Sequence, residues 1–324
     1  MAGLRHACIF MSSNRPGFIM SAGILGANQV ILDLENAVAF PKKSEARHMA
    51  QQAVRYLTQQ REDLGLQMEI TVRINAPSGP LVIMDLDGIV STAPDVIRIP
   101  TVNTGKEVEW IDRHISKLES EYGLQPGKIK LHPMIETPRG LLNIREILSA
   151  SSRIDAVAIG GEDYAKNSAI TRTEGWPEMD YVRWTVVTTA QAYGIDAIDT
   201  VYMQYDDMEG FYEDTVRIRN MGFSGRAIMH PSQIKIVQNV FTPNESEINE
   251  LQSFFEKLSY SKQNGKNFWI SSGKTIEDET FIFQQHRRLR RAGLTPYTFG
   301  QFIERAAVLE EQDTRFDRSL ICKH

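Results

Sequence analysis

The feature that most constrains this sequence is a regular alternation of short apolar runs with longer segments of helical spacing. The apolar runs have the length and the polar boundaries of buried β-strands. They cover residues 7–11, 29–34, 69–74, 95–99, 128–134, 154–159, 194–199 and 225–229. Helical spacing follows Pro16 and recurs at residues 42–61, 106–121, 139–150, 179–193 and 208–221. Eight strands that alternate with helices predict a closed parallel sheet, the (β/α)8 TIM barrel of the α/β class.

The alternation stops near residue 242, and the rest of the chain has a different pattern. Helical spacing there covers residues 243–260 and 275–292, and a third segment looks helical as far as Glu311. A chain of 324 residues is long enough for one barrel and an appendage. We therefore predict a barrel domain at residues 1–241 and a C-terminal helical lid or oligomerisation region at residues 242–324.

Composition excludes several classes of protein. A net charge of −5 with 24% charged residues indicates no nucleic acid and no anionic membrane as partner. The two cysteines, Cys8 and Cys322, form neither a disulfide framework nor a metal-binding spacing. The apolar run at 7–11 is too short for a signal peptide, and no run has the length of a membrane span. These features predict a cytoplasmic protein in a reducing compartment.

Two acidic turns stand out because each follows a predicted strand. Glu136 follows the run at 128–134, and Asp163 follows the run at 154–159, with one predicted helix between them. Consecutive parallel strands end on the same rim of a barrel, so the two carboxylates are expected to share that rim. Oxygen ligands without Cys or nearby His suit Mg²⁺. The alternative is that each acid only caps a helix or lies in a solvated turn.

Further charged side chains follow the other predicted strands. In a TIM barrel the carboxyl ends of the strands form the catalytic face. Core packing alone would not concentrate charge at these positions. The residues expected on that face are Glu35, Arg73, Glu136, Asp163, Asp199 and His230.

In their order and spacing, the motifs of this chain resemble the citrate lyase beta-subunit and malyl-CoA lyase family within the HpcH/HpaI aldolase superfamily. The matching segments run from Asn14 to about Ala292, most of the chain. They are Asn14-Arg15-Pro16, Ile31-Leu32-Asp33-Leu34-Glu35 with Ala37-Val38, Val72-Arg73-Ile74-Asn75, Ile135-Glu136-Thr137-Pro138, Gly161-Glu162-Asp163, Ala197-Ile198-Asp199, Gly222-Phe223 with Gly225, and His230-Pro231 with Gln233-Ile234.

The resemblance implies roles for the residues at matching positions. Glu136 and Asp163 match the family's metal ligands, here for Mg²⁺. Arg73 matches an arginine that grips the substrate carboxylate or carbonyl, a task that suits a planar bidentate donor. Glu35 matches a position near the substrate, and the alternative is that it only forms an ion pair with Arg73.

Three more positions are implied to lie at the substrate. They are Arg15, Gly161 and Glu162. The chain also departs from the family pattern twice. Asn36 stands where the family usually has Asp, which removes one negative charge from the rim. Thr101 stands where the family commonly has Lys, which puts the usual recognition of CoA or an acyl carrier in doubt.

The reaction implied by the resemblance is reversible, Mg²⁺-dependent cleavage of a 3-hydroxyacyl thioester, such as a malyl, citramalyl or citryl unit, into a 2-oxo acid and an acyl thioester. The expected partners are thus a small 2-oxo acid and a CoA thioester. An aldolase for free 4-hydroxy-2-oxo acids and a non-catalytic assembly subunit are the alternatives. A Schiff-base aldolase is disfavoured because none of the eight strand ends carries a lysine.

The remaining expectation concerns the proton carrier. In the family an acid after a Gly-Lys turn closes over the active site of a neighbouring subunit, and Gly273-Lys274 occupies that place here. Three acids follow, Glu277, Asp278 and Glu279, of which the resemblance favours Asp278. The alternative is an acidic helix N-terminus. A lid that acts between subunits requires a homo-oligomer, expected to be a trimer or hexamer.

Overall fold

The computed structural model of the chain describes all residues except 1–3, 174, 245, 251–268, 272–273 and 277–324. The chain divides into two units, Met1–Gln238 and Asn239–His324, and each is described by itself. The division of the protein into the two predicted domains stays a prediction.

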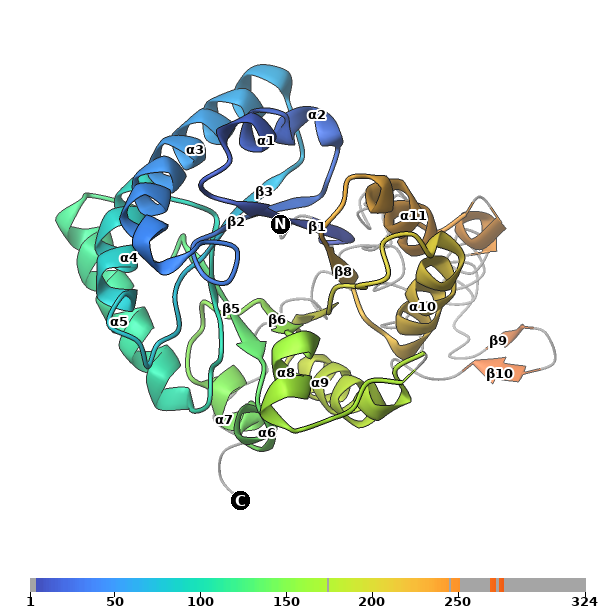
Figure 1. The fold of residues 1–324 in the computed structure, drawn as a ribbon. Helices are drawn as coiled ribbons and strands as arrows, with labels where there is room; N and C mark the ends of the chain where they lie inside the picture. Colours follow the sequence, from blue (N-terminus) through green and yellow to red (C-terminus); the bar gives the residue numbers. More distant parts are fainter. Residues whose placement is uncertain (1–3, 174, 245, 251–268, 272–273, 277–324) are drawn as a thin grey trace. The chain divides into compact units, whose positions relative to one another are not determined.

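The first unit is built on eight parallel strands that close into a barrel, as predicted (Figure 1). Each strand pairs with its neighbour in sequence, and β8 pairs back with β1. The strands are β1 (Ala7–Ser12), β2 (Gln29–Asp33), β3 (Glu69–Arg73), β4 (Val96–Ile99), β5 (Lys130–Ile135), β6 (Ala156–Ile159), β7 (Asp196–Asp199) and β8 (Gly225–Ile228).

Helices surround the strands, as Figure 1 shows. They are α1 (Pro16–Met20), α2 (Ala22–Leu25), α3 (Lys43–Leu64), α4 (Val82–Ile89), α5 (Gly105–Glu121), α6 (Pro138–Leu142), α7 (Ile144–Ser149), α8 (Gly161–Asn167), α9 (Asp180–Ala192), α10 (Met208–Met221) and α11 (Ser232–Phe241). Three short 3₁₀ helices, Phe40–Lys42, Val90–Thr92 and Pro177–Met179, lie between them.

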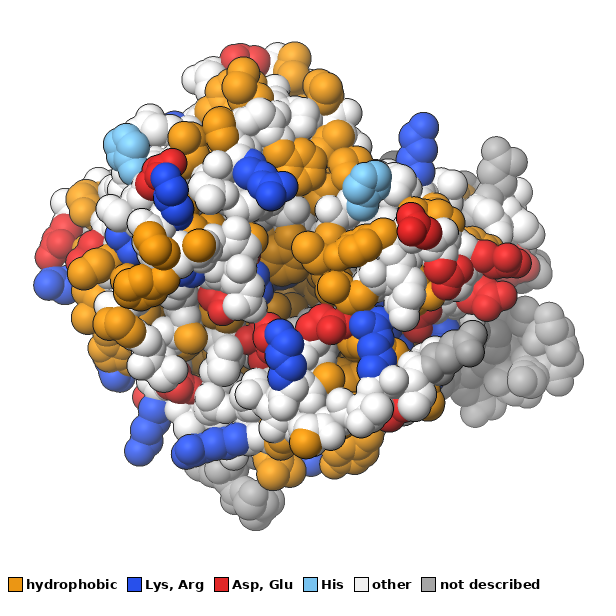
Figure 2. Space-filling model, in the orientation of Figure 1, with side chains coloured by type: hydrophobic (Ala, Val, Ile, Leu, Met, Phe, Trp, Pro, Cys, Tyr) orange, Lys and Arg blue, Asp and Glu red, His pale blue; other side chains and the backbone are white. Residues whose placement is uncertain are grey.

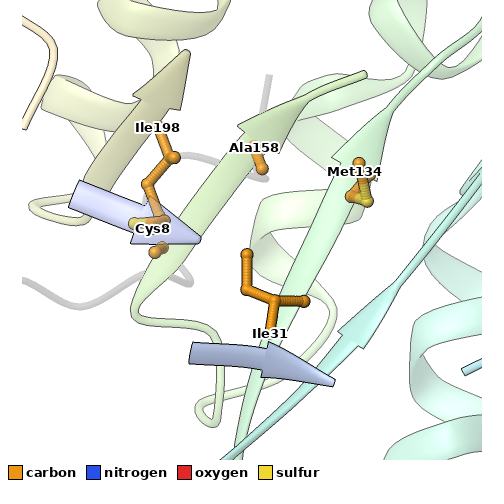
Figure 3. Close-up of a cluster of buried hydrophobic side chains, with 6 residues drawn as sticks. Cys8, Ile31, Met134, Ala158 and Ile198 are labelled. Carbon is orange, nitrogen blue, oxygen red and sulfur yellow. The ribbon is translucent and has the colours of Figure 1, made fainter. Parts of the chain in front are cut away.

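The barrel interior is filled by an apolar layer. Figure 3 shows Cys8, Ile31, Met134, Ala158 and Ile198, side chains from five different strands that form one buried cluster. All five are at most 4% exposed. The interior is therefore a packed core, and the polar side chains of the two barrel ends are separated by it.

Helix starts hold the loops of the carboxyl-terminal rim in place. Thr104 caps α5 in a capping box with Glu107, and the Thr137 hydroxyl accepts a hydrogen bond from the Gly140 N–H at the start of α6. Because Thr137 directly follows Glu136, the cap of α6 also fixes the backbone next to that carboxylate.

Several predicted boundaries need correction. The single helix predicted at residues 139–150 is two helices, α6 and α7, because Asn143 leaves the helical conformation and donates its amide to the Asn103 carbonyl. The acidic turn at Asp163 is in fact the first turn of α8. Helices α4 and α11 were not predicted, although the buried residues Val82, Leu86 and Ile89 of α4 recur at helical spacing.

In the second unit few residues are described. Residues 246–250 of the helix predicted at 243–260 are helical. The helix predicted from Thr275 is wrong at its start, because β10 (Lys274–Ile276) pairs antiparallel with β9 (Trp269–Ser271). β-branched residues such as Thr275 and Ile276 favour strands. In the described part of the chain, no helix combines the length and the apolar character needed to cross a membrane.

Candidate active site

Glu136 lies directly after β5 and is only 2% exposed. Its Oε2 atom accepts two hydrogen bonds from Thr101, one from the backbone N–H at 2.8 Å and one from the hydroxyl at 2.7 Å. Thr101 follows β4, so the contact joins two neighbouring strand ends. One oxygen of the carboxylate is therefore fully engaged.

The other oxygen of Glu136, Oε1, is buried and has no hydrogen-bond partner among the described residues. Gly160 lies against it, since a Cβ at position 160 would come within 2.3 Å of Oε1. Burial raises the pKa of Glu136 to about 7, with the charges of Asp163 and Glu35 adding to the rise and Arg73 and Thr101 opposing it. A buried carboxylate oxygen that no described residue satisfies favours a cation beside it.

Asp163 lies in the first turn of α8, after β6, and its side chain is 28% exposed. Its Oδ2 accepts a hydrogen bond from the Asn36 amide at 3.0 Å, and its Oδ1 accepts one from the Lys166 ammonium at 3.1 Å. Asn36 follows β2, on the opposite side of an eight-stranded barrel from β6. An aspartate at position 36, the usual residue of the family, could not donate this hydrogen bond. Asn36 therefore makes a contact between the two sides of the barrel rim that an aspartate could not make.

The residues at this rim fit a Mg²⁺ ion. The described residues contain no cluster of three or more His, Cys, Asp or Glu side chains arranged to hold a metal. Glu136 and Asp163 offer only oxygen ligands, and Mg²⁺ is commonly held by one or two carboxylates with water or substrate filling the remaining positions. The unpartnered oxygen of Glu136 is the observation that carries this fit.

Arg73, the last residue of β3, is held by the carboxylate of Asp33, for which the sequence predicted no role. Its Nε and Nη2 atoms donate to Oδ1 and Oδ2 of Asp33 at 2.6 and 2.7 Å. Its Nη1 atom lies 3.3 Å from Oε2 of Glu35, and its guanidinium lies 4.7 Å from the ring centre of Phe10. Asp33 thus occupies the Nε and Nη2 donors of Arg73, and only Nη1 faces Glu35.

Asp33 also organises the loop that follows β2. It accepts hydrogen bonds from the backbone N–H groups of Glu35 and Ala37 at 3.0 and 2.9 Å. Against burial, the charge of Arg73 and these hydrogen bonds hold the pKa of Asp33 below its usual range. The signal that could have found it is the alternation of a strand, because Asp33 and Glu35 stand two residues apart.

Glu35 is half-buried, and burial raises the pKa of its carboxyl despite the opposing charge of Arg73. The ion pair with Arg73, considered as the alternative role for Glu35, is present in the structure. The contact does not exclude a role at the substrate, because the Glu35 side chain is still 19% exposed.

The three other predicted substrate positions differ in their surroundings. Arg15 is exposed at the start of α1. The Gly161 N–H donates to the Thr200 hydroxyl at 2.9 Å, and Glu162 forms an ion pair with Arg172 at 2.7 Å. All three follow strand ends, but Gly161 and Glu162 already have partners, and the substrate role of these residues stays a prediction.

Two residues expected on the catalytic face do not join the carboxylate pair. Asp199 is fully buried and accepts hydrogen bonds from Arg183 of α9, with Arg226 of β8 within 3.6 Å of it. The prediction for Asp199 was wrong because its neighbour Ile198 points into the barrel, so the next side chain points out toward the helices.

His230 is exposed, and its Nδ1 lies 2.7 Å from the Ser232 hydroxyl. The lid acids Glu277, Asp278 and Glu279 lie outside the described residues.

A second buried arginine adds positive charge beneath the rim. Arg98 pairs in register with Arg73 and is fully buried, and its one hydrogen bond to a side chain among the described residues goes to Gln29 at 2.8 Å. Burial lowers the pKa of Arg98 to about 10, so it stays protonated at neutral pH. In the space-filling view of Figure 2 the centre of the barrel is hollowed, with acidic and basic side chains at its margin. Such an opening can take a small anionic ligand.

Comparisons with known proteins agree with the motifs. Residues 6–231 match the HpcH/HpaI aldolase/citrate lyase family. The chain is 32% identical over 303 residues to the citrate lyase subunit beta of Leuconostoc mesenteroides subsp. cremoris, covering 93% of this chain and 98% of that protein. It is 31% identical over 284 residues to the mitochondrial citramalyl-CoA lyase of Rattus norvegicus, covering 84% and 82%. A solved structure of the citrate lyase beta subunit from M. tuberculosis, complexed with oxaloacetate and magnesium, is 26% identical, with a TM-score of 0.61, and the match covers 75% of this chain and 98% of that chain.

Proposed function

Because this chain belongs to the HpcH/HpaI aldolase/citrate lyase family and is therefore a lyase, we propose that it is a Mg²⁺-dependent carbon–carbon lyase. Its substrate would be a 3-hydroxyacyl thioester, such as malyl-, citramalyl- or citryl-CoA, which it cleaves reversibly to a 2-oxo acid and an acyl thioester. The relatives named citrate lyase and citramalyl-CoA lyase support this substrate class.

The observation that carries the proposal is the buried oxygen of Glu136 that has no hydrogen-bond partner among the described residues and lies at the same rim as Arg73. A metal ligand and a cationic donor at one opening are what an oxo acid requires, because it presents a carboxylate beside a polarised carbonyl. The relative from M. tuberculosis, whose structure was solved with oxaloacetate and magnesium, supports the same pairing.

Glu136 and Asp163 would hold the metal. When bound, Mg²⁺ supplies Lewis-acid polarisation of the oxygen that becomes the carbonyl and a template for the neighbouring carboxylate. Thr101 and Asn36 keep the two protein carboxylates in place. The residues of this chain then have to orient the substrate and move two protons.

The bond that breaks joins the carbon next to the thioester to the carbon that bears the hydroxyl. The hydroxyl proton goes to Glu35, whose raised pKa suits a base. Nη1 of Arg73 donates to the oxygen as the carbonyl of the 2-oxo acid forms. The electron pair of the broken bond moves into the thioester as an enolate, and a proton added at its carbon completes the acyl thioester.

A direct assay tests the substrate class. The purified protein with Mg²⁺ is given malyl-, citramalyl- and citryl-CoA, the same acyl groups on an acyl-carrier protein, and a free 4-hydroxy-2-oxo acid, and the released 2-oxo acid is measured. We expect cleavage of a thioester that stops on addition of EDTA. Cleavage of the free acid alone would make the protein a free-acid aldolase, and no cleavage of any substrate would favour an assembly subunit.

The proton donor to the enolate carbon stays a prediction, with Asp278 favoured over Glu277 and Glu279. We also keep as a proposal that residues 242–324 form a lid in a homo-oligomer. Mixing Asp278→Asn with Glu136→Ala subunits should partly restore activity if each site takes its acid from a neighbour. No restoration despite subunit exchange would contradict a lid that acts between subunits.

A further inference from the structure

We propose that Thr101 is a positioning residue that holds one oxygen of Glu136 so that the other oxygen is presented to the cation. The inference rests on the proposed function, because it assigns Glu136 as a metal ligand. It goes beyond that function by giving a task to a position that follows β4 and carries no ionisable group.

The two oxygens of Glu136 have different surroundings. Both donors of Thr101, its N–H and its hydroxyl, reach the same atom, Oε2 of Glu136, at 2.8 and 2.7 Å. Oε1 is buried without a hydrogen-bond partner among the described residues and lies against Gly160. The last torsion of a glutamate side chain is broad and nearly two-fold, so a carboxylate without such a clamp exchanges its two oxygens easily.

The backbone of Thr101 is strained, so the surrounding structure must hold this residue in place. Thr101 has a φ of +50°, a left-handed conformation that is an outlier for a β-branched residue. Glycine would adopt this conformation without strain, but glycine has no hydroxyl. Backbone strain of this kind persists only where the surrounding structure imposes it, and it concentrates at functional sites.

Asn103 provides that surrounding structure. Its side-chain amide donates to the Thr101 carbonyl at 3.0 Å, and its side-chain oxygen accepts a hydrogen bond from the Thr137 hydroxyl at 2.5 Å. Thr137 directly follows Glu136, so the strained turn is tied to the same backbone that carries the carboxylate. Thr101, Asn103 and Thr137 therefore form one hydrogen-bonded unit around Glu136.

The test compares Thr101→Gly, Thr101→Ser and the matched control Ala93→Gly. Ala93 has the same strained backbone, with a φ of +51°, and precedes β4, at the end opposite to Thr101. The variants are made in the full chain, and Mg²⁺ affinity is measured by calorimetry without substrate. Melting temperature, kcat and KM for the best thioester are measured in parallel.

We expect Thr101→Gly to weaken Mg²⁺ binding about 10-fold, the usual loss when a partner that orients a metal ligand is removed. Its melting temperature should change little, because relief of the backbone strain offsets the lost hydrogen bond and the greater freedom of glycine in the unfolded chain. Thr101→Ser should keep wild-type affinity, because it retains the hydroxyl. Ala93→Gly should also keep wild-type affinity, since it relieves strain away from the carboxylates.

Each opposing result has a distinct meaning. Wild-type Mg²⁺ affinity in Thr101→Gly would overturn the inference and leave the proposed function intact. A loss in Thr101→Ser as large as in Thr101→Gly would also overturn it, because the hydroxyl would then not be the cause. Equal Mg²⁺ binding by the wild type and Glu136→Gln would overturn the metal assignment itself, and with it both the inference and the proposed function.

Discussion

The two ends of the barrel carry similar numbers of charged side chains but differ in how completely these charges are paired. At the amino-terminal end, which we call the floor cluster, Arg5 donates to three carboxylates, Glu69 at 2.7 Å, Asp155 at 2.8 Å and Asp196 at 3.2 Å. At the carboxyl-terminal end, the rim cluster leaves an oxygen of Glu136 without a hydrogen-bond partner in the described part of the chain. The floor cluster is made of Arg5, Gln29, Glu69, His132, Asp155 and Asp196, and the rim cluster of Asp33, Glu35, Asn36, Arg73, Thr101, Glu136 and Asp163.

The pKa values of Glu69 and Asp155 in the floor cluster are lowered, whereas at the rim those of Glu35 and Glu136 are raised and only that of Asp33, paired with Arg73, is lowered. Against burial, Arg5 holds the pKa of Glu69 below its usual value, and the His132 hydrogen bond with the charge of Arg5 does the same for Asp155. At the rim, burial raises the pKa of Glu35 and raises that of Glu136 to about 7. Paired charges at the floor stabilise the fold, and we propose that the incompletely paired carboxylates at the rim bind a ligand.

The largest expected effect comes from breaking the floor. Arg5→Met should lower the free energy of unfolding by about 3 kcal/mol, because Glu69 and Asp155, whose side chains are 12% and 26% exposed, lose their common partner, whereas solvent screens the 35% exposed Asp196. Urea unfolding measures this change, with Arg55→Met on the exposed face of α3 as the control. If Arg5→Met lost activity but kept the stability of the wild type, the assignment of a structural role to the floor cluster would be contradicted.

Breaking the rim should have the converse result. Glu136→Gln should lower thioester cleavage by at least about 100-fold, since a metal contributes several kcal/mol to transition-state stabilisation. Its unfolding free energy should be unchanged or higher, because a buried charge without a full set of partners is removed. Glu109→Gln on the exposed face of α5 is the control. Full activity of the variant with EDTA present would show that no metal acts at Glu136.

Arg73 provides a further test of the difference between floor and rim, because it lies at the rim but its charge is well paired. Arg73→Lys should lower kcat/KM about 30-fold, nearly as much as Arg73→Ala, since loss of a charged hydrogen bond costs about 2 kcal/mol and an ammonium cannot span both oxygens of Asp33. Steady-state kinetics on the best thioester measure both variants. If lysine restored most of the rate, Arg73 would contribute charge alone.

The smallest expected effect is a dependence on pH of the stability that the floor cluster contributes. The folded pKa of Glu69 lies below its unfolded value of about 4.3, so its contribution is complete above that pH and is lost as the pH falls toward the folded pKa. Glu69→Gln should therefore be less stable than the wild type by about 1 kcal/mol at pH 7, and the difference should shrink below about pH 4. Unfolding by urea at a series of pH values measures it, and a difference that is independent of pH would contradict the ion pair.

The barrel, and the strand ends at which Glu136 and Asp163 lie, follow from local features of the sequence. The eight apolar runs predict the eight strands to within about two residues, because length and polar boundaries are short-range properties. The position of Glu136 and Asp163 after consecutive strands placed them on one rim for the same reason. The motifs then predicted the family, which the comparisons confirm.

Only the tertiary structure decided which partner each charged side chain has. Asp33 meets Arg73 because β2 and β3 pair in that register, and Asn36 reaches Asp163 across 127 residues of sequence because β2 and β6 stand opposite each other. Asp199 turns outward through the alternation of its strand, and Thr101 takes its strained conformation because Asn103 and Glu136 hold it there. A sequence pattern predicts which residues reach the rim, but hydrogen-bond partners depend on distances of a few tenths of an ångström that closure of the barrel sets.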